Sequence, residues 1–278
     1  MKHRPTTYIL IGAVIALFSI FSLPKEEEQS SIRDFNDIMS QKELKVTTEY
    51  GSNTYFIDES GNLQGEHFEL ISEFAKQHDL RLTIIPEMSI SRQNEMIHNG
   101  ECDLIVTPRP LNAETENGLR QTIPLGVDKQ IVVQRKKNTV TDSLSTDSCM
   151  YLNSLIDLGG KSICMPKDSP FKHRLANLME EIGDTIIAYE IPRYNTEQLI
   201  ALVAHGDICY AICEEDIVKK NMNKYTNLDN RLAFSFNQFY AWTVSERSPI
   251  LLDSLNAWIT KRKVKNSNRI TEVKSAKK

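Results

Sequence analysis

The alternation of apolar and polar residues divides the chain into strands and helices from residue 44 onward. Short β-branched or apolar runs predict strands that are covered on one or both faces. They lie at residues 44–47, 81–85, 103–107, 129–134, 161–165, 185–189, 207–213 and 238–244. Apolar residues at helical spacing predict helices at residues 66–78, 91–99, 169–182, 196–205, 214–223 and 249–262. Residues 107–125 form a long polar segment with three prolines and no predicted element.

These elements alternate as strand, helix, strand up to residue 107, and the same order starts again near residue 160. This order predicts an α/β fold with parallel sheets and helices on their faces. In such sheets ligands lie beyond the carboxyl ends of the strands. The loop after the first strand and the hairpin signal at residues 55–62 therefore place Glu49, Tyr50, Ser52 and Tyr55 at a predicted cleft. For Tyr55, core packing is the alternative.

The first 23 residues predict export. Lys2, His3 and Arg4 precede an apolar run at residues 8–23, which is the pattern of a signal peptide or signal anchor. The run is slightly short for a spanning helix of about 20 apolar residues. Residues 24–43 are polar and predict a linker that ends in a short helix. We expect a periplasmic protein, either free or anchored to the inner membrane by residues 8–23.

The last residues, 265–278, form a basic tail. The apolar periodicity stops at Val264, so we expect this segment to be disordered. Its lysines and arginines allow two interpretations. Either they only solubilise the chain, or they contact an anionic membrane surface.

Composition and motifs narrow the function classes. The 278 residues are 40% hydrophobic and 25% charged, as in ordinary globular proteins, and the net charge of −4 argues against a nucleic-acid partner. No GxSxG, HExxH, Walker A or dinucleotide motif occurs, so we expect no cofactor and no enzymatic activity. Five cysteines cannot all pair, and none has zinc-binding spacing, so we expect no metal site. Cys209 and Cys213 lie about 13 Å apart on one predicted strand, and we expect buried free thiols.

Several short sequences occur in an order that resembles a known family. They are Leu44-Lys45-Val46, Thr54-Tyr55-Phe56, Gly65 before Glu69-Leu70, residues 100–104, residues 160–163, residues 166–169, and Gly206-Asp207 before Tyr210. Over residues 44–264 this order resembles the family-3 extracellular solute-binding proteins. It is most similar to the binding-protein-like half of the membrane-bound lytic transglycosylase F family. The lysozyme-like catalytic domain of that family is expected to be missing, because fourteen residues follow Val264.

The resemblance implies the type II periplasmic binding fold. Two lobes, each with a mostly parallel sheet flanked by helices, are then joined by two hinge strands near residues 126–132 and 235–239. Lobe 1 is expected to contain residues 44–127 and 238–264, and lobe 2 residues 128–237. The ligand is expected between the lobes.

The resemblance also implies site residues. The arginine that anchors an α-carboxylate in amino-acid-binding members aligns with Thr115, so the usual anchor is missing. Arg109 or Arg120 could replace it, because a guanidinium binds carboxylates in bidentate fashion, although surface charge is the alternative. The carboxylate that binds the ammonium group aligns with Glu214. Its alternative is an acid that only stabilises a helix start.

Residues 166–169 give a further predicted contact. Ser169 is a good N-cap and Pro170 suits the first helical position, so free N–H groups there favour an anion. The alternative is that Asp168 and Ser169 only cap their own helix. Lys167, Glu49 and Glu214 are the candidates for acid–base chemistry. Tyr240 is a further aromatic candidate for the cleft.

The sequence therefore predicts a protein that closes two lobes on a small polar solute, such as an amino acid, a peptide or a cell-wall fragment. The output is either uptake through an ABC permease or sensing. One alternative is a regulatory relative of a lytic transglycosylase that senses peptidoglycan fragments and acts with a cell-wall hydrolase. Another is a dehydratase-like enzyme on the same fold.

Overall fold

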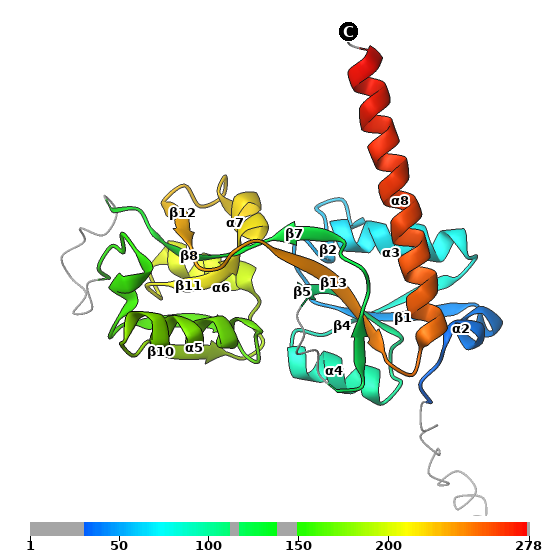
Figure 1. Cartoon of the computed structure of the whole chain (residues 1–278), viewed down its shortest axis with the longest axis horizontal. Coiled ribbons are helices and arrows are strands. Elements are labelled where there is room, and N and C mark those ends of the chain that lie inside the picture. The colour runs from blue at the N-terminus through cyan, green and yellow to red at the C-terminus, as the bar shows by residue number, and fades with distance from the viewer. Residues whose placement is uncertain (1–30, 112–116, 138–148, 277–278) are drawn as a thin grey trace, which may run out of the picture. The chain divides into compact units, whose positions relative to one another are not determined.

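The protein contains two α/β lobes, each built around one mixed sheet (Figure 1). The computed structural model describes residues 31–111, 117–137 and 149–276, with side chains as far as Lys265. The sheet of lobe 1 has the order β4-β1-β5-β13-β6, and β7 pairs with β13. These strands are β4 (Arg81–Pro86), β1 (Glu43–Thr48), β5 (Leu104–Pro110), β13 (Gln238–Ser245), β6 (Leu119–Gln121) and β7 (Gly126–Asp128).

The sheet of lobe 2 has the order β10-β9-β11-β8-β12. Its strands are β10 (Ile187–Ile191), β9 (Ser162–Pro166), β11 (Ala211–Glu214), β8 (Gln130–Arg135) and β12 (Leu228–Ala233). In each lobe three adjacent strands are parallel, namely β4-β1-β5 and β10-β9-β11. The remaining strands pair antiparallel. A short hairpin of β2 (Phe56–Ile57) and β3 (Leu63–Gln64) follows β1.

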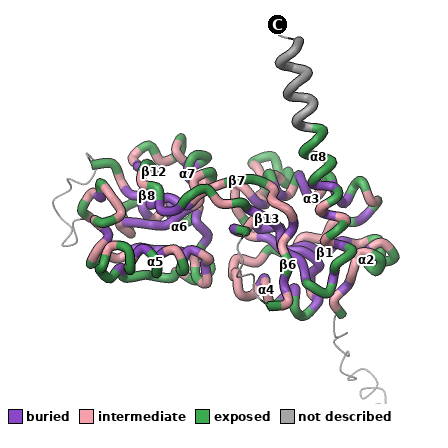
Figure 2. Tube along the Cα trace, viewed as in Figure 1, coloured by how far each residue is buried: buried purple, intermediate pink, exposed green. Residues whose placement is uncertain are grey.

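Helices cover the sheets and complete the cores. They are α2 (Phe35–Gln41), α3 (Glu66–Gln77), α4 (Ile90–His98), α5 (Phe171–Ile182), α6 (Thr196–His205), α7 (Glu215–Asn221) and α8 (Pro249–Ala276), with the 3-10 turn η2 (Leu155–Leu158). In lobe 1 the apolar faces of α3 and α8 bury Phe74 and Leu255 against Trp242 of β13. In lobe 2 one face of the sheet packs on α5 and the other on α6. Figure 2 shows that burial concentrates along the central strands and the inner faces of the helices.

The chain passes between the sheets twice, from β7 into β8 and from β12 into β13. The two passages are bonded to each other. The amide Nε2 of Gln130 donates to Gln238 Oε1 at 3.0 Å and to the Tyr240 hydroxyl at 2.6 Å. Two lobes joined by two strands were predicted, and the structure confirms this arrangement.

Several predicted boundaries differ from the structure. The strands β6 and β12 were not predicted, because both expose polar residues and lack a continuous apolar run. The strand predicted at residues 207–213 begins only at Ala211. The prediction of Ser169 as N-cap is wrong, since Pro170 occupies that position; the Ser169 hydroxyl instead accepts from the N–H of Phe171 at 3.3 Å.

The predicted linker, residues 24–43, extends too far. Residues from Arg33 onward belong to lobe 1, where Ile38 of α2 is fully buried in the core. The prediction of a disordered tail is also wrong, because α8 continues to Ala276. After Pro249 the chain has no glycine or proline, and its eight Lys and Arg residues are good helix formers.

The cysteines depart from the expectation of free thiols. Cys149 and Cys209 form a disulfide across 60 residues, so the expectation for Cys209 is wrong. It holds for Cys213, which is free and buried, as are Cys102 and Cys164. Cysteine pairing cannot be deduced from spacing alone when the partners lie on distant segments.

Within the described residues no helix combines the length and the apolar character that a membrane crossing needs. The predicted signal at residues 1–23 lies outside the described residues.

The buried ion pair between Arg33 and Asp103 gives a direct test of the lobe 1 boundary. The Arg33 Nε atom donates to Asp103 Oδ1 at 2.9 Å, and the two side chains are 8% and 1% exposed. We expect Asp103→Asn to lower the free energy of unfolding by about 3–5 kcal/mol, because it leaves a buried guanidinium without its counter-charge. Urea unfolding measures this.

A matched control is Asp79→Asn. Asp79 pairs with Lys42 at 3.4 Å, but its side chain is 95% exposed. Exposed pairs contribute little, so the expected change is below about 0.5 kcal/mol. Equal effects of the two substitutions would show that Arg33 is not part of the lobe 1 core.

Candidate functional site: a cavity between the lobes

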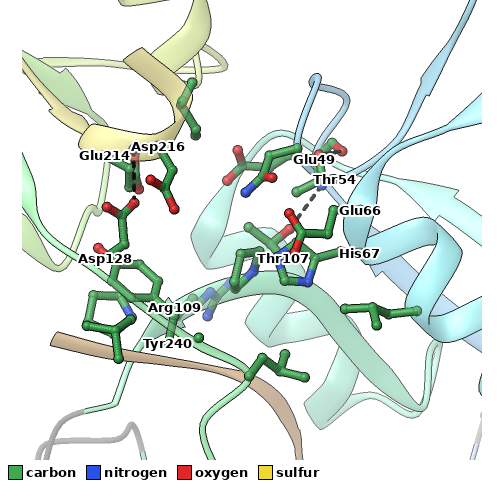
Figure 3. A pocket seen from close by; sticks show the side chains of 18 of the residues that line it. Glu49, Thr54, Glu66, His67, Thr107, Arg109, Asp128, Glu214, Asp216 and Tyr240 are labelled. Carbon is green, nitrogen blue, oxygen red and sulfur yellow. Dashed lines mark hydrogen bonds between the residues drawn. The ribbon is translucent and has the colours of Figure 1, made fainter. Parts of the chain in front are cut away.

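A cavity of about 200 Å³ lies where the two lobes and the crossing strands meet (Figure 3). The carboxyl ends of β1 and β5 and the start of α3 line it from lobe 1. The ends of β9 and β11 and the starts of α5, α6 and α7 line it from lobe 2. Its polar lining residues are Glu49, Asn53, Thr54, Glu66, His67, Thr107, Arg109, Asp128, Ser169, Thr196, Glu214, Asp216, Tyr240, Arg262 and Lys263.

Glu49 is the first residue after β1, and its backbone is fixed on both sides. Its N–H donates to Thr107 Oγ1 at 3.0 Å, and its carbonyl accepts from Thr54 Oγ1 at 2.7 Å. Burial raises the pKa of the Glu49 carboxyl to about 8, with a smaller contribution from the charge of Glu214 and an opposing one from Arg109. Glu49 is therefore largely protonated at neutral pH.

Glu214 closes β11 and precedes α7, so it reaches the cavity from lobe 2. Burial raises the pKa of its carboxyl to about 7, although a hydrogen bond with Thr196 opposes the shift. Its Oε2 atom is shielded from solvent and has no hydrogen-bond partner in the described part of the chain. An unsatisfied buried acceptor is unfavourable by about 1–3 kcal/mol, which a donor on a bound solute would offset.

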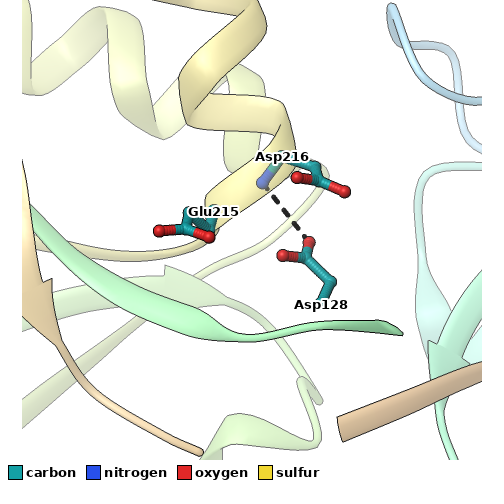
Figure 4. A group of neighbouring side chains, drawn as sticks. All are labelled: Asp128, Glu215 and Asp216. Atoms are coloured by element: carbon teal, nitrogen blue, oxygen red, sulfur yellow. Dashed lines mark hydrogen bonds between the residues drawn. The ribbon is translucent and has the colours of Figure 1, made fainter. Parts of the chain in front are cut away.

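Asp128 adds a third carboxyl on the first crossing strand. Burial raises its pKa to about 6, even though it accepts from the N–H of Lys129 at 2.8 Å. With Glu215 and Asp216 it forms a group whose carboxylate oxygens lie within 4.8 Å of one another (Figure 4). Because Glu215 is paired with Lys129 and Lys219, the charge of this group is partly balanced by the protein itself.

Arg109 on β5 brings positive charge to the lobe 1 wall. Its guanidinium is oriented by α4, donating to Asn94 Oδ1 at 2.5 Å and to Gln93 Oε1 at 2.7 Å. Gln93 is itself fully buried and bonded to Thr107 at 3.2 Å. A guanidinium held in this way can bind a solute carboxylate without losing its position.

The arrangement combines several acids with few cations in a partly enclosed space. A solute amine or guanidinium would favour the ionised forms of Glu49 and Glu214, because an opposite charge lowers the pKa of a carboxyl. A solute carboxylate would face the Arg109 guanidinium on the same wall. The site can therefore bind a cationic or zwitterionic solute by charge and shape alone.

The loop after β1 contacts the start of α6 in the other lobe. The N–H of Ser52 donates to Glu197 Oε2 at 2.9 Å, and Asn195 Nδ2 donates to the carbonyl of Tyr50 at 2.9 Å. Gly51 lies between them, and a Cβ there would come within 3.0 Å of Asn195 Nδ2. We call Tyr50, Gly51 and Ser52 with Asn195 and Glu197 the interlobe contact.

The structure brings only part of the predicted site to the cavity. Among the residues predicted from sequence, Glu49, Arg109, Ser169, Glu214 and Tyr240 line it. Those that do not line it are Tyr50, Ser52, Tyr55 and Lys167, and Thr115 lies outside the described residues. Tyr50 and Ser52 instead contact the start of α6 through their loop, and their role in binding a solute stays a prediction.

Tyr55 and Lys167 miss the cavity for separate reasons. The Tyr55 ring packs between Tyr50 and Phe68, with ring centroids 6.0 and 6.1 Å away, which favours the packing alternative. Lys167 is exposed at the end of β9. Arg120 pairs with Glu246 at 3.3 Å with its side chain 59% exposed, as a surface charge does.

Sequence reasoning missed Asp128, His67, Thr107 and Thr196. Three of them had a usable signal, because Thr107 ends a predicted strand, and His67 and Thr196 lie in the first turns of predicted helices at the cleft. Asp128 had none, since its position depends on how the chain crosses between the lobes. For His67 the sequence predicts only a place at the start of the helix at residues 66–78.

Comparison with known proteins now defines the family. The profile of bacterial extracellular solute-binding proteins, family 3, matches residues 44–274. The chain belongs to this family. The type II periplasmic binding fold, predicted from the order of short sequences, is thereby confirmed.

Two curated relatives are named membrane-bound lytic murein transglycosylase F. The protein of Shewanella pealeana is 25% identical over 218 residues, which cover 78% of this chain and 43% of that protein. The protein of Aeromonas salmonicida is 25% identical over 252 residues, covering 87% and 47%. The chain thus spans less than half the length of these relatives.

Solved structures of binding proteins share the fold. The arginine-bound form of a truncated arginine-binding protein from T. maritima has a TM-score of 0.66 and 16% identity, covering 82% of this chain and 99% of that one. An amino acid ABC transporter substrate-binding protein from Streptococcus pneumoniae, bound to L-arginine, has a TM-score of 0.67 and 18% identity, covering 86% and 95%. Similarity at this level of identity supports the fold of the family-3 protein.

The raised pKa of Glu49 predicts how stability depends on pH. Its folded-state pKa of about 8 exceeds the ordinary value of 4.5, so the folded state binds the proton more tightly. The stabilisation is complete below about pH 4.5 and is lost as pH rises toward 8. We expect Glu49→Gln to reduce the fall in melting temperature between pH 5 and 8.5, measured without added solute. The control, Glu59→Gln on the exposed β2–β3 turn, should follow the wild type.

The interlobe contact can be tested through Gly51. An alanine Cβ would approach Asn195 Nδ2 to 3.0 Å and Glu197 Oε2 to 3.4 Å. We expect Gly51→Ala to weaken the two hydrogen bonds of the interlobe contact. The equilibrium between closed and open lobes should then shift toward the open form by about 1–3 kcal/mol. Small-angle X-ray scattering should record a larger radius of gyration. Gly126→Ala, where the added Cβ has no heavy atom within 4 Å, should not change it. An unchanged scattering profile for both variants would contradict the prediction.

Proposed function

We propose that this chain is an exported binding protein whose two lobes close on a small polar solute that carries a positive charge. The observation that carries the proposal is the cavity between the lobes, where Glu49 and Glu214 are held with raised pKa values. Hinge motion about two crossing strands is a known way for two lobes to close on a ligand. The polar solute is released when the lobes separate.

An amino acid is the simplest solute that fits both walls. Its ammonium or a side-chain cation would pair with Glu49 and Glu214, and its carboxylate with Arg109. Structural neighbours with the same fold are described as bound to arginine and, in Wolinella succinogenes, to lysine. These ligands belong to those proteins; for this chain they suggest the first compounds to test.

A peptidoglycan fragment is the second candidate. It is favoured by the sequence relatives named membrane-bound lytic murein transglycosylase F, because this chain matches one region of those proteins. A muropeptide also carries amines and carboxylates, so the same cavity chemistry applies. The two candidates differ in output, which is uptake through an ABC permease for the first and regulation of a cell-wall hydrolase for the second.

The periplasm is the proposed location. The disulfide between Cys149 and Cys209 supports an oxidising compartment, because such bonds are rare in proteins that remain in the cytosol. The dehydratase-like alternative is weaker, because Lys167, one of its three acid–base candidates, does not line the cavity, although Glu49 and Glu214 do.

Glu214 provides the test of the proposed function. A thermal-shift screen with L-arginine, L-lysine, neutral amino acids and a muramyl peptide should identify at least one ligand, which at 100 times its Kd adds about 2.7 kcal/mol of stability. For that ligand Glu214→Gln should weaken binding by about 1.5–3 kcal/mol, because one charge-assisted hydrogen bond is lost. The wild-type affinity should rise between pH 6 and 8 as the cavity carboxyls ionise.

The matched control is Glu215→Gln, next in the chain but paired with Lys129 and Lys219. We expect its affinity to remain within about 0.5 kcal/mol of the wild type. If Glu214→Gln lowers the melting temperature and leaves affinity unchanged, Glu214 acts only at the start of α7.

A further inference from the structure

His67 lies at the wall of the cavity in the first turn of α3. His67 is 7% exposed and is one of the residues that line the cavity. Its backbone N–H donates to the carbonyl of Asn53 at 3.2 Å, so the helix start is tied to the loop that follows β1. The imidazole therefore has a fixed position beside the space where a solute binds.

One nitrogen of the imidazole is already engaged. Trp242 on β13 is fully buried, and its indole Nε1–H donates to His67 Nδ1 at 3.1 Å. An indole nitrogen can only donate, so Nδ1 must be the accepting, unprotonated nitrogen. A neutral imidazole carries one proton, and it must then be on Nε2.

The imidazole stays neutral throughout the physiological range. Burial lowers the pKa of His67 to about 3, with a smaller contribution from the charge of Lys220. A second proton on Nδ1 would also oppose the indole N–H. Within the described chain no group accepts a hydrogen bond from Nε2.

We propose that His67 contacts the bound solute through a neutral Nε2–H donor, and that Trp242 is the positioning residue that fixes this tautomer. The inference rests on the proposed function and deepens it, because it states which group the solute must carry. A donor of this kind binds an oxygen acceptor, either a carbonyl, a hydroxyl or a carboxylate. It does not bind an amine that is already protonated.

The cavity then selects for two features at once. The carboxyls of Glu49 and Glu214 require a cation, and the Nε2–H of His67 requires an oxygen acceptor. Unlike Arg109, a neutral donor does not require that the oxygen be charged. The solute class is therefore an amine that also carries a carbonyl or carboxylate, as an amino acid or its amide does, and not a simple diamine.

The first experiment detects the tautomer directly. Long-range ¹H–¹⁵N NMR spectra of the full chain should show the Nε2–H form of His67, unchanged from pH 5 to 8. Trp242→Phe should convert it to a mixture of tautomers, because Nδ1 no longer has its donor. A wild-type spectrum with the proton on Nδ1, or no change in Trp242→Phe, would overturn the inference.

The second experiment measures binding of L-lysine, L-lysinamide and 1,5-diaminopentane by calorimetry. We expect the wild type to bind the diamine more weakly than the other two compounds. His67→Phe should weaken binding of lysine and lysinamide about tenfold, the effect of one lost hydrogen bond, and leave the weaker diamine binding unchanged. His67→Gln, which retains an acceptor for Trp242 and a donor for the cavity, should recover part of the loss.

The outcomes separate the two hypotheses. One outcome is that the wild type binds lysine and lysinamide while His67→Phe weakens the binding of all ligands equally or of none. In that case His67 is only the hydrogen-bond acceptor of Trp242. The inference then fails, and the proposed function stands. If the wild type binds neither these compounds nor the amino acids and muramyl peptide of the thermal-shift screen, the proposed function fails. The ligand role of His67 then fails with it.

Discussion

Two carboxyl groups from different lobes are placed where ionisation is unfavourable. Glu49 follows the first strand of lobe 1 and Glu214 ends a strand of lobe 2, so bringing the lobes together buries both in one cavity. Without a counter-ion, each charge disfavours the other and burial disfavours both. A solute cation between the two carboxyls favours their ionised forms. Solute binding and lobe closure are therefore coupled through the same electrostatic interaction.

The crossing strands make that balance possible, because they let the lobes move without separating. Gln130 bonds the first passage to Tyr240 in the second, so the two passages move together. Asp128 lies on the first passage with its own raised pKa, and lobe motion therefore changes its environment as well. The loop at Gly51 limits how closely the lobes approach, since its neighbours leave no space for a side chain.

The sequence predicted the residues whose position follows from local order. Glu49 comes directly after an apolar strand, and the carboxyl ends of strands meet at one edge of a sheet. Glu214 was predicted from the family resemblance. The double crossing came only from family resemblance, because no periodicity marks a chain that leaves a sheet and returns. His67 was missed because its role depends on Trp242, 175 residues away. The interlobe contact of Tyr50 and Ser52 could not be predicted, because it uses their backbone groups, which are independent of residue type.

The disulfide has a consequence for how the protein acquires its covalent structure. Thiol–disulfide exchange requires a thiolate that can reach the bond. The three remaining cysteines are buried, and burial raises the pKa of Cys102 to about 12 and the pKa values of Cys164 and Cys213 above their ordinary value. Once the lobes have folded, these thiols supply almost no nucleophile. The disulfide between Cys149 and Cys209 is therefore protected against exchange with the other cysteines of the folded protein. Folding thus fixes which cysteines stay paired.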